Sequence, residues 1–254
     1  MQHKHFDFII AGAGAAGLSL LVRMILSGKF ADSKILLADK EPKKFNDRTW
    51  CFWEKENGLF EELIFKSWNR ISIFNTGFSK HLDIAPYRYK MIRGIDFYQY
   101  CFDIINAQKD ITVEYGEITA VRNDGEQACI EINGQILSGD YVFNSIRLKE
   151  SVKANGTHNL LQHFTGWIVE MESEVFDEQT ATLMDFRTSQ EHGCSFVYVM
   201  PFTKNTALVE YTLFSKQLLR PEQYAESLTT YLSTHFPGVN YVVTSTEFGV
   251  IPMT

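Results

Sequence analysis

The stretch that decides the fold is Phe6-Asp7-Phe8-Ile9-Ile10-Ala11-Gly12-Ala13-Gly14-Ala15-Ala16-Gly17-Leu18, in which an apolar strand runs into a G-x-G-x-x-G turn. Gly12 can adopt the angles of the tight turn, Gly14 has no Cβ to block a pyrophosphate, and Gly17 lets the next helix pack closely on the strand. The N-terminus of that helix directs unpaired N–H groups at the phosphates. The motif alone fits a packing turn equally well, so its surroundings must decide.

The segment after the turn favours dinucleotide binding. Residues 18–26 continue a helix, Gly28 is placed to end it, and residues 34–38 form a second apolar strand. Asp39 follows this strand, 27 positions after Gly12. In dinucleotide-binding units of about 30 residues, a carboxylate here accepts hydrogen bonds from ribose hydroxyls. Asp39 is therefore predicted to bind the adenosine ribose; the alternative is a strand-end residue in a turn.

The composition excludes several classes of protein. A net charge of −7 and a pI near 5.5 argue against a nucleic-acid partner. The four cysteines form no C-x-x-C pair, which predicts reduced thiols, a cytoplasmic location and no metal site. The first strand follows Met1 too closely for a signal peptide, and no apolar run approaches the ~18 residues of a membrane span. Any membrane contact is expected to be peripheral.

In the rest of the first half, the chain is predicted to leave the nucleotide domain and then to return to it. Residues 41–56 are predicted as a loop, and residues 68–74 and 79–84 as short strands. Helical spacing of apolar residues then predicts a helix over 94–107. The pattern that follows predicts a parallel-type strand at residues 111–115. It then predicts a meander of two strands, at residues 117–121 and 126–132, that turns at 123–125, and a further buried strand at residues 140–144. This order suits a flavin-type doubly wound domain better than a plain NAD domain.

Beyond residue 150 the pattern changes to long alternating strands. They are expected at residues 162–171, 181–186, 195–201, 206–214 and 241–251, with one helix over 221–235. An antiparallel sheet with a covering helix cannot be a second Rossmann half, so we interpret it as a substrate-binding layer. We therefore predict an α/β protein with a Rossmann-like domain (residues 1–66 and 94–150) and a substrate-binding domain (residues 67–93 and 151–254).

The chain resembles the FAD-dependent lycopene cyclases, particularly the bacterial lycopene β-cyclase type. The resemblance runs nearly end to end and rests on motifs in a fixed order: FDFIIAGAGAAGLSLL at the start, NDRTWCFWE at 46–54, LMDFR at 183–187, VYVMPF at 197–202, LVEYT at 208–212 and GVIPM at 249–253. It implies a fold like flavoprotein hydroxylases and geranylgeranyl reductases. It also implies bound FAD that must be reduced, with NAD(P)H as the reductant, and cyclisation of the ends of lycopene without net redox change.

The resemblance extends the predicted cofactor site beyond the glycines and Asp39. It implies that Arg93, just before a helix, contacts the flavin nucleotide, where a guanidinium neutralises pyrophosphate charge bidentately. The alternative is a solvated arginine at a helix start. The other residues predicted to bind the cofactor are Ala13, Ala16, Arg48 and Ile118.

Glu210 is the predicted catalytic acid. The family's acidic motif is FLEET, and LVEYT retains only its first glutamate, with Tyr211 in place of the second. Glu210 shares a strand face with Leu208, Thr212 and Phe214, where burial would raise its pKa and keep it protonated near neutral pH. A protonated carboxyl in an apolar site is a suitable acid for an alkene. The alternative is a solvent-exposed face on which Glu210 only aids solubility.

Two further features are candidates for the catalytic site. Asp185 in LMDFR either holds the proton donor in place or balances the cation, or else caps a turn at the end of a strand. Trp50, Phe52 and Trp53 lie where the family places residues that face flavin and substrate. Aromatic faces stabilise carbocations by about 0.5 to 2 kcal/mol per contact, although core packing also explains such a group.

The predicted reaction begins when Glu210, or the reduced flavin, protonates the terminal alkene of a linear carotene. The neighbouring double bond attacks the cation, and loss of a ring proton completes the cyclic end group. One alternative is a prenyl-chain reductase that delivers hydride to the alkene. A third is an inactive fragment, because relatives continue about a hundred residues past GVIPM with a segment that contacts the flavin. We accordingly expect residues 1–254 alone to bind FAD poorly and to be inactive.

Overall fold

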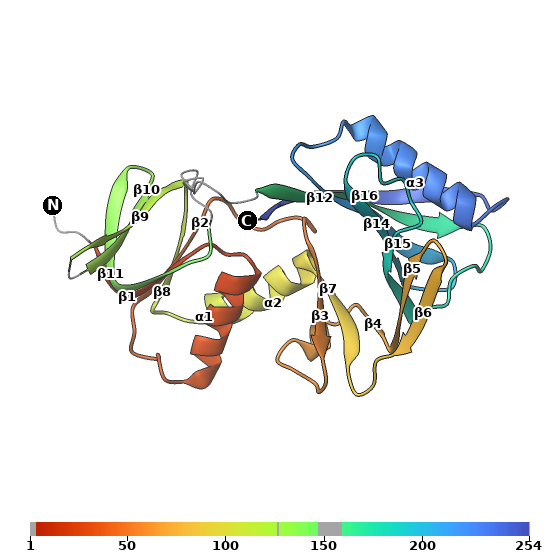
Figure 1. Cartoon of the computed structure of the whole chain (residues 1–254). Coiled ribbons are helices and arrows are strands. Elements are labelled where there is room, and N and C mark those ends of the chain that lie inside the picture. Colours follow the sequence, from red (N-terminus) through yellow and green to blue (C-terminus); the bar gives the residue numbers. More distant parts are fainter. Residues whose placement is uncertain (1–3, 126, 147–158, 254) are drawn as a thin grey trace. The chain divides into compact units, whose positions relative to one another are not determined.

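The computed structural model describes residues 4–125, 127–146 and 159–253. The chain divides into two compact units (Figure 1). Unit 1 comprises Met1–Asn46 and Gly94–Lys153, and unit 2 comprises Asp47–Arg93 and Ala154–Thr254. Residues 47–66, which we expected in the nucleotide domain, belong to unit 2. The reason is strand pairing, because β3 (Thr49–Glu54) and β4 (Lys66–Trp68) both pair with β7 (Arg88–Arg93).

Unit 1 is built on a six-stranded sheet with the order β8-β2-β1-β11-β10-β9. The parallel part consists of β8 (Ile111–Tyr115), β2 (Ile35–Asp39), β1 (His5–Ala11) and β11 (Gln135–Asn144). The meander strands β9 (Ile118–Asp124) and β10 (Gln127–Ile132) continue it in antiparallel pairing. Helices α1 (Ala15–Ser27) and α2 (Gly94–Asn106) pack against each other. The expected strand–turn–helix–strand unit, the helix over 94–107 and the meander are therefore present.

One strand of unit 1 differs from its prediction. Residues 140–144 were expected to be buried, but Tyr141 and Phe143 are 63% and 41% exposed. Both rings stack on Phe8, with centroids 5.9 and 6.4 Å from its ring. No other described element of unit 1 covers them, so apolar composition alone misled the prediction.

Unit 2 is dominated by a seven-stranded sheet with the order β16-β12-β15-β14-β13-β5-β6. Its strands are β12 (Leu160–Met171), β13 (Thr180–Asp185), β14 (Cys194–Pro201), β15 (Thr206–Ser215), β16 (Tyr241–Met253), β5 (Arg70–Asn75) and β6 (Phe78–Asp83). All neighbours are antiparallel except β13 and β5, which run parallel. The sequence-derived strands of this layer are confirmed, but the segment predicted as one strand at 68–74 is divided between β4 and β5.

The two faces of this sheet have different covers. Helix α3 (Pro221–His235) packs on one face, where Val209, Tyr211 and Leu213 of β15 meet Leu228 and Leu232. The opposite face is covered by the small sheet β3-β7-β4, whose Tyr89 and Met91 join Leu208 and Met200 in a second core. β15 is therefore buried on both sides, as its nearly continuous apolar sequence requires.

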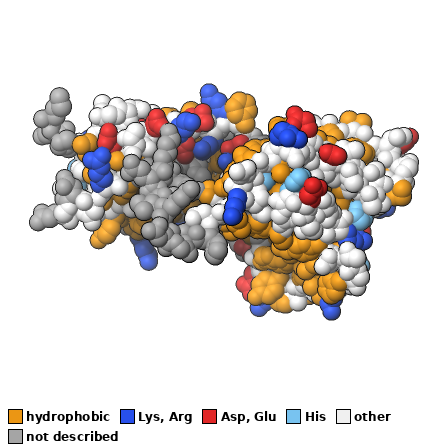
Figure 2. Space-filling model, turned by 45° about the horizontal axis from the view of Figure 1, so that its top comes forward, with side chains coloured by type: hydrophobic (Ala, Val, Ile, Leu, Met, Phe, Trp, Pro, Cys, Tyr) orange, Lys and Arg blue, Asp and Glu red, His pale blue; other side chains and the backbone are white. Residues whose placement is uncertain are grey.

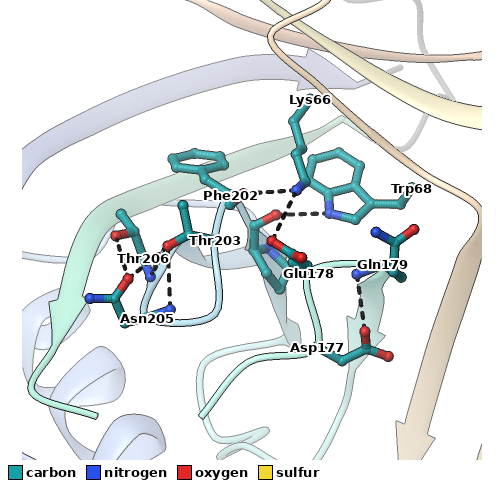
Figure 3. Close-up of polar contacts among 10 residues, drawn as sticks. Lys66, Trp68, Asp177, Glu178, Gln179, Phe202, Thr203, Asn205 and Thr206 are labelled. Carbon is teal, nitrogen blue, oxygen red and sulfur yellow. Dashed lines mark hydrogen bonds and ion pairs between the residues drawn. The ribbon is translucent and has the colours of Figure 1, made fainter. Parts of the chain in front are cut away.

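Hydrogen bonds fix the small sheet over that second face. The Trp68 indole donates to the Pro201 carbonyl at 2.9 Å, and the Lys66 ammonium donates to the Phe202 carbonyl at 2.7 Å (Figure 3). Both carbonyls lie at the end of β14, where Thr203 and Asn205 organise the turn into β15. The residues of β15 that point toward the small sheet are thus held in a closed layer and shielded from water.

Candidate active site

The glycine turn of unit 1 has the geometry expected of a phosphate site. Gly12 has φ +109°, and a Cβ on Gly17 would lie 1.9 Å from the Gly12 carbonyl oxygen, so both positions require glycine. A Cβ on Gly14 would meet nothing within 4 Å. The space beside Gly14 is therefore open to a ligand, while the other two glycines shape the turn.

The N-terminus of α1 faces this open space without a side-chain cap. Gly14 is the N-cap residue, and the first turn contains no acidic side chain. The N–H groups of the first turn and the helix dipole therefore remain available for an anion. These features fit the pyrophosphate of a dinucleotide.

Asp39 is buried beside the turn. Its carboxylate accepts hydrogen bonds from the backbone N–H of Ala13 at 2.6 Å and from the Lys43 ammonium at 3.0 Å. A carboxylate has about four acceptor positions, so it retains capacity for a hydroxyl. Asp39 thus joins the end of β2 to the glycine turn, which is where the sequence predicts a ribose-binding carboxylate.

The other residues predicted to bind the cofactor are distributed over both units. Ala16 is exposed in the first turn of α1, and Ile118 is partly buried against the core of unit 1. Arg48 and Arg93 belong to unit 2, where the Arg93 guanidinium lies 4.7 Å from the centre of the Phe65 ring. Contacts of these four residues with a cofactor stay predictions.

Glu210 lies on the face of β15 covered by the small sheet and is 9% exposed. The Thr212 hydroxyl donates to its Oε1 at 2.7 Å. Burial raises the pKa of Glu210 to about 8, and a second carboxyl, Glu247, adds to the rise, although the hydrogen bond from Thr212 opposes it. The expectation that Glu210 is buried is confirmed, and the exposed alternative is wrong.

Glu247 is the functional candidate that sequence reasoning missed. Gly166 of β12 pairs with Glu210 on one side and with Glu247 on the other, so both side chains project over a residue that has none. The two carboxyls are therefore neighbours across Gly166, and Glu247 contributes to the raised pKa of Glu210. Glu247 also accepts a hydrogen bond from the Thr49 hydroxyl at 2.9 Å. The signal in the sequence was a glutamate two residues before GVIPM, but only strand register links it to Glu210.

The groups that surround the two carboxyls are weak acids held neutral. Burial raises the pKa of Cys51 to about 12 and that of Tyr198 to about 12, and it raises the pKa of Tyr89 above its usual value. Each of these groups also feels the negative charge of Glu210. The site therefore combines one protonated acid with aromatic and thiol groups that do not compete for its proton.

Asp185 does not join this site. It lies at the end of β13 on the face covered by α3, in register with Val197. The Arg187 guanidinium binds its carboxylate through two nitrogens, at 2.9 and 2.7 Å, and the Tyr231 hydroxyl donates at 2.8 Å. The expectation that Asp185 holds or balances the proton donor is not met. Asp185 and Glu210 pair with two consecutive residues of β14, and consecutive positions of a strand point to opposite faces of the sheet.

This placement predicts a structural role for Asp185. Burial raises the pKa of its carboxyl, but the hydrogen bonds and charge of Arg187 outweigh burial and hold it below the ordinary value of 3.8. A lowered folded-state pKa stabilises the protein above that value, and the stabilisation is lost as the pH falls through the folded-state pKa. Asp185→Asn should lower the free energy of unfolding by about 1.5–3 kcal/mol at pH 7, measured by urea denaturation. An equal loss at pH 3 would contradict the assignment.

The aromatic group of β3 is likewise divided. Residues 41–56 are not a continuous loop, because β3 occupies Thr49–Glu54. Strand alternation turns Trp53 toward the side of Tyr89, with ring centroids 4.7 Å apart, whereas Trp50 and Phe52 take the other side. The residues of β3 that reach the Glu210 site are Thr49 and Cys51.

Tyr211, which stands in place of the second glutamate of FLEET, lies outside the Glu210 site. Its side chain points to the α3 face and its hydroxyl donates to Ser195 Oγ at 3.1 Å. Tyr211→Phe should therefore cost about 1 kcal/mol of stability, the value of one buried hydrogen bond. Product formation per folded molecule should not change, as chromatography of extracted pigments would show. A loss of product equal to that of Glu210→Gln would place Tyr211 in the active site.

Comparisons with solved structures define the class of fold. A geranylgeranyl bacteriochlorophyll reductase-like protein from Thermoplasma acidophilum is 14% identical, with a TM-score of 0.62, over 98% of this chain and 66% of that chain. A probable FAD-dependent monooxygenase from Pseudomonas aeruginosa is 14% identical, with a TM-score of 0.62, over 98% and 74%. The p-nitrophenol 4-monooxygenase from Pseudomonas putida is 9% identical, with a TM-score of 0.66, and the match covers 98% of this chain and 69% of that chain. The fold is that of flavin-dependent hydroxylases and geranylgeranyl reductase-like proteins.

The family follows from the sequence itself. Residues 7–254 match the profile of the lycopene cyclase family, described as "Lycopene cyclase protein". The chain belongs to the lycopene cyclase family. No protein with a curated description matched. The chain spans about two thirds of the length of the reductase-like protein.

Proposed function

We propose that this protein is a lycopene β-cyclase, an isomerase of carotenoid biosynthesis that converts the linear ends of lycopene into β-rings by acid-initiated cyclisation. The observation that carries the proposal is the buried Glu210 carboxyl, whose pKa is raised to about 8 by burial, in a chain of the lycopene cyclase family. The glycine turn and Asp39 support FAD as the cofactor. Reduced FAD, when bound, supplies negative charge that stabilises a carbocation.

The residues of unit 2 perform the proton transfer. The protonated carboxyl of Glu210 donates its proton to the terminal alkene, so an O–H bond breaks and a C–H bond forms. The neighbouring π electrons close the ring, and a ring carbon then loses a proton to a carboxylate. Because the small sheet excludes water from Glu210, the acid stays protonated near pH 7 and the cation is protected from capture by water.

The insolubility of lycopene supports peripheral association with a membrane. Among residues 4–125, 127–146 and 159–253, no helix combines the length and the hydrophobicity that crossing a bilayer requires. On the face seen in Figure 2, Lys and Arg side chains are scattered among Asp and Glu. We propose that contact with the membrane occurs through the substrate and apolar side chains, with no nucleic acid as a partner.

The mass of the product tests the reaction. Produced in lycopene-accumulating cells together with the segment that relatives carry after GVIPM, the protein should yield cyclic carotenes of the same mass as lycopene, with reductant needed only in catalytic amounts. A prenyl-chain reductase, the activity suggested by the reductase-like neighbour, adds two hydrogens per double bond and consumes reductant stoichiometrically. Chromatography with mass spectrometry separates these outcomes.

A further inference from the structure

The row Glu210–Gly166–Glu247 brings two carboxyls together in an otherwise apolar layer. The three residues lie on neighbouring strands β15, β12 and β16 in one register. A Cβ on Gly166 would lie 2.9 Å from both Glu247 Cγ and Leu208 Cδ1. Any larger residue at 166 would therefore push Glu247 away, and glycine is what allows the two side chains to meet.

The strand register places the two carboxyls side by side on one face of the sheet, and Glu247 is one cause of the raised pKa of Glu210. Two neighbouring carboxyls in a poorly hydrated site hold one proton between them, because two negative charges side by side there are strongly unfavourable. The outward oxygens are already satisfied, because Thr212 donates to Glu210 Oε1 and Thr49 donates to Glu247 Oε2. Each threonine thus fixes one oxygen of one carboxyl of the pair.

The two members of the pair differ in burial. Glu210 lies in the interior of β15, whereas Glu247 is half-buried on the edge strand β16. The titratable groups that face Glu210 from the small sheet and from β14 are Cys51, Tyr89 and Tyr198, which stay neutral near pH 7. Glu247 is therefore the member of the pair that lies nearer the solvent.

On the basis of the proposed function, we propose that Glu247 is the proton-sharing partner of Glu210: the pair holds one proton, releases it to the alkene and recovers one from the closing ring. In the first step an O–H bond breaks and a C–H bond forms. In the last step a ring C–H bond breaks, its electrons form the ring double bond, and the O–H bond is restored. No net proton, electron or water is consumed.

The geometry provides the driving force for the last step. After the proton has left, two negative carboxylates lie side by side in a poorly hydrated site, an arrangement that strongly favours recapture of a proton. Glu247 is accordingly a positioning residue: it keeps Glu210 protonated before the reaction and favours return of the ring proton to the carboxyl pair afterwards.

The test is a pH titration of the carboxyls in the folded full chain. Infrared spectroscopy of protein with labelled glutamate monitors the titration, and no carotene is present. The unmodified chain should lose its protonated carboxyl signal near pH 8, the value given by Glu210. Glu247→Gln removes a negative neighbour and should lower that midpoint by about one pH unit or more. Glu170→Gln, an exposed glutamate on β12, is the matched control and should change nothing.

A second variant tests the pair even if Glu247→Gln folds poorly. Thr49→Val removes the hydroxyl that holds the Glu247 carboxyl in place, so Glu247 can turn away from Glu210 and the midpoint should fall, in the same direction as in Glu247→Gln but by less. Midpoints that stay at the unmodified value in both variants would overturn the inference. The titration is independent of product formation, so a chain that shows these shifts but makes no cyclic carotene refutes the proposed function and leaves the shared proton standing.

Discussion

Glu210→Gln is expected to reduce the formation of cyclic carotenes by at least about 100-fold, because a positioned general acid contributes about 10²–10⁴ to a rate. Glutamine retains the shape of the side chain and can still accept from Thr212, but it has no acidic proton. Folding should be preserved, since removing a buried ionisable group in a site that raises its pKa removes a cost of folding at alkaline pH. The measurement is pigment analysis of cells that produce equal amounts of each protein.

The stability of the same variant provides an independent readout. The folded-state pKa of Glu210 lies above its ordinary value of 4.5, so the folded protein binds more protons than the unfolded chain between about pH 4.5 and pH 8. Stability therefore falls as the pH rises through this window, and Glu210→Gln should flatten that dependence. Glu170→Gln serves again as the exposed control. Unchanged pigment formation together with an unchanged pH dependence would remove Glu210 from the mechanism.

The glycine turn gives the second large effect, with different consequences for stability at Gly17 and Gly14. Gly17→Ala places a Cβ 1.9 Å from the Gly12 carbonyl oxygen, so the helix must move away from the strand. Overpacking of this kind costs about 1–3 kcal/mol or more. Gly14→Ala meets no atom within 4 Å and should leave the thermal midpoint nearly unchanged. Its methyl group does, however, enter the space in front of the helix N-terminus and should lower the flavin content.

The measurement pairs thermal unfolding of the apoprotein with the flavin absorbance of the purified full chain. Gly17→Ala should lower both the midpoint and the flavin content, whereas Gly14→Ala should lower only the flavin content. If Gly14→Ala kept full flavin content, the space beside Gly14 would not be the pyrophosphate site.

Much of the fold was predictable because local patterns and tertiary structure agree. The glycine turn, α1 and Asp39 form one short unit whose geometry depends on residues close in the sequence. α3 begins at Pro221 and ends at His235, as its apolar spacing and N-terminal proline indicated. The exposed Tyr141 and Phe143 were missed because periodicity says that a residue is apolar and does not say what covers it.

The candidate site was only half predictable, and the reason is register. The position of Glu210 on an apolar strand face is a local property, and it was confirmed. Glu247 lies 37 positions away and meets Glu210 only through Gly166, which belongs to a third strand. Asp185 was equally plausible from its sequence, but the pairing of β13 turns it to the α3 face. A single sequence does not specify such cross-strand pairing.

The most direct test of the central claim, that this chain cyclises lycopene by proton transfer from a buried carboxyl, is to run the reaction in deuterated water and analyse the product by mass spectrometry. In a single turnover of protein equilibrated with deuterated water, we predict cyclic carotenes in which the first ring formed carries a solvent-derived deuterium at the carbon that was protonated, and no such product from Glu210→Gln. Cyclic product without solvent deuterium, or linear product that has gained two hydrogens per double bond, would contradict it.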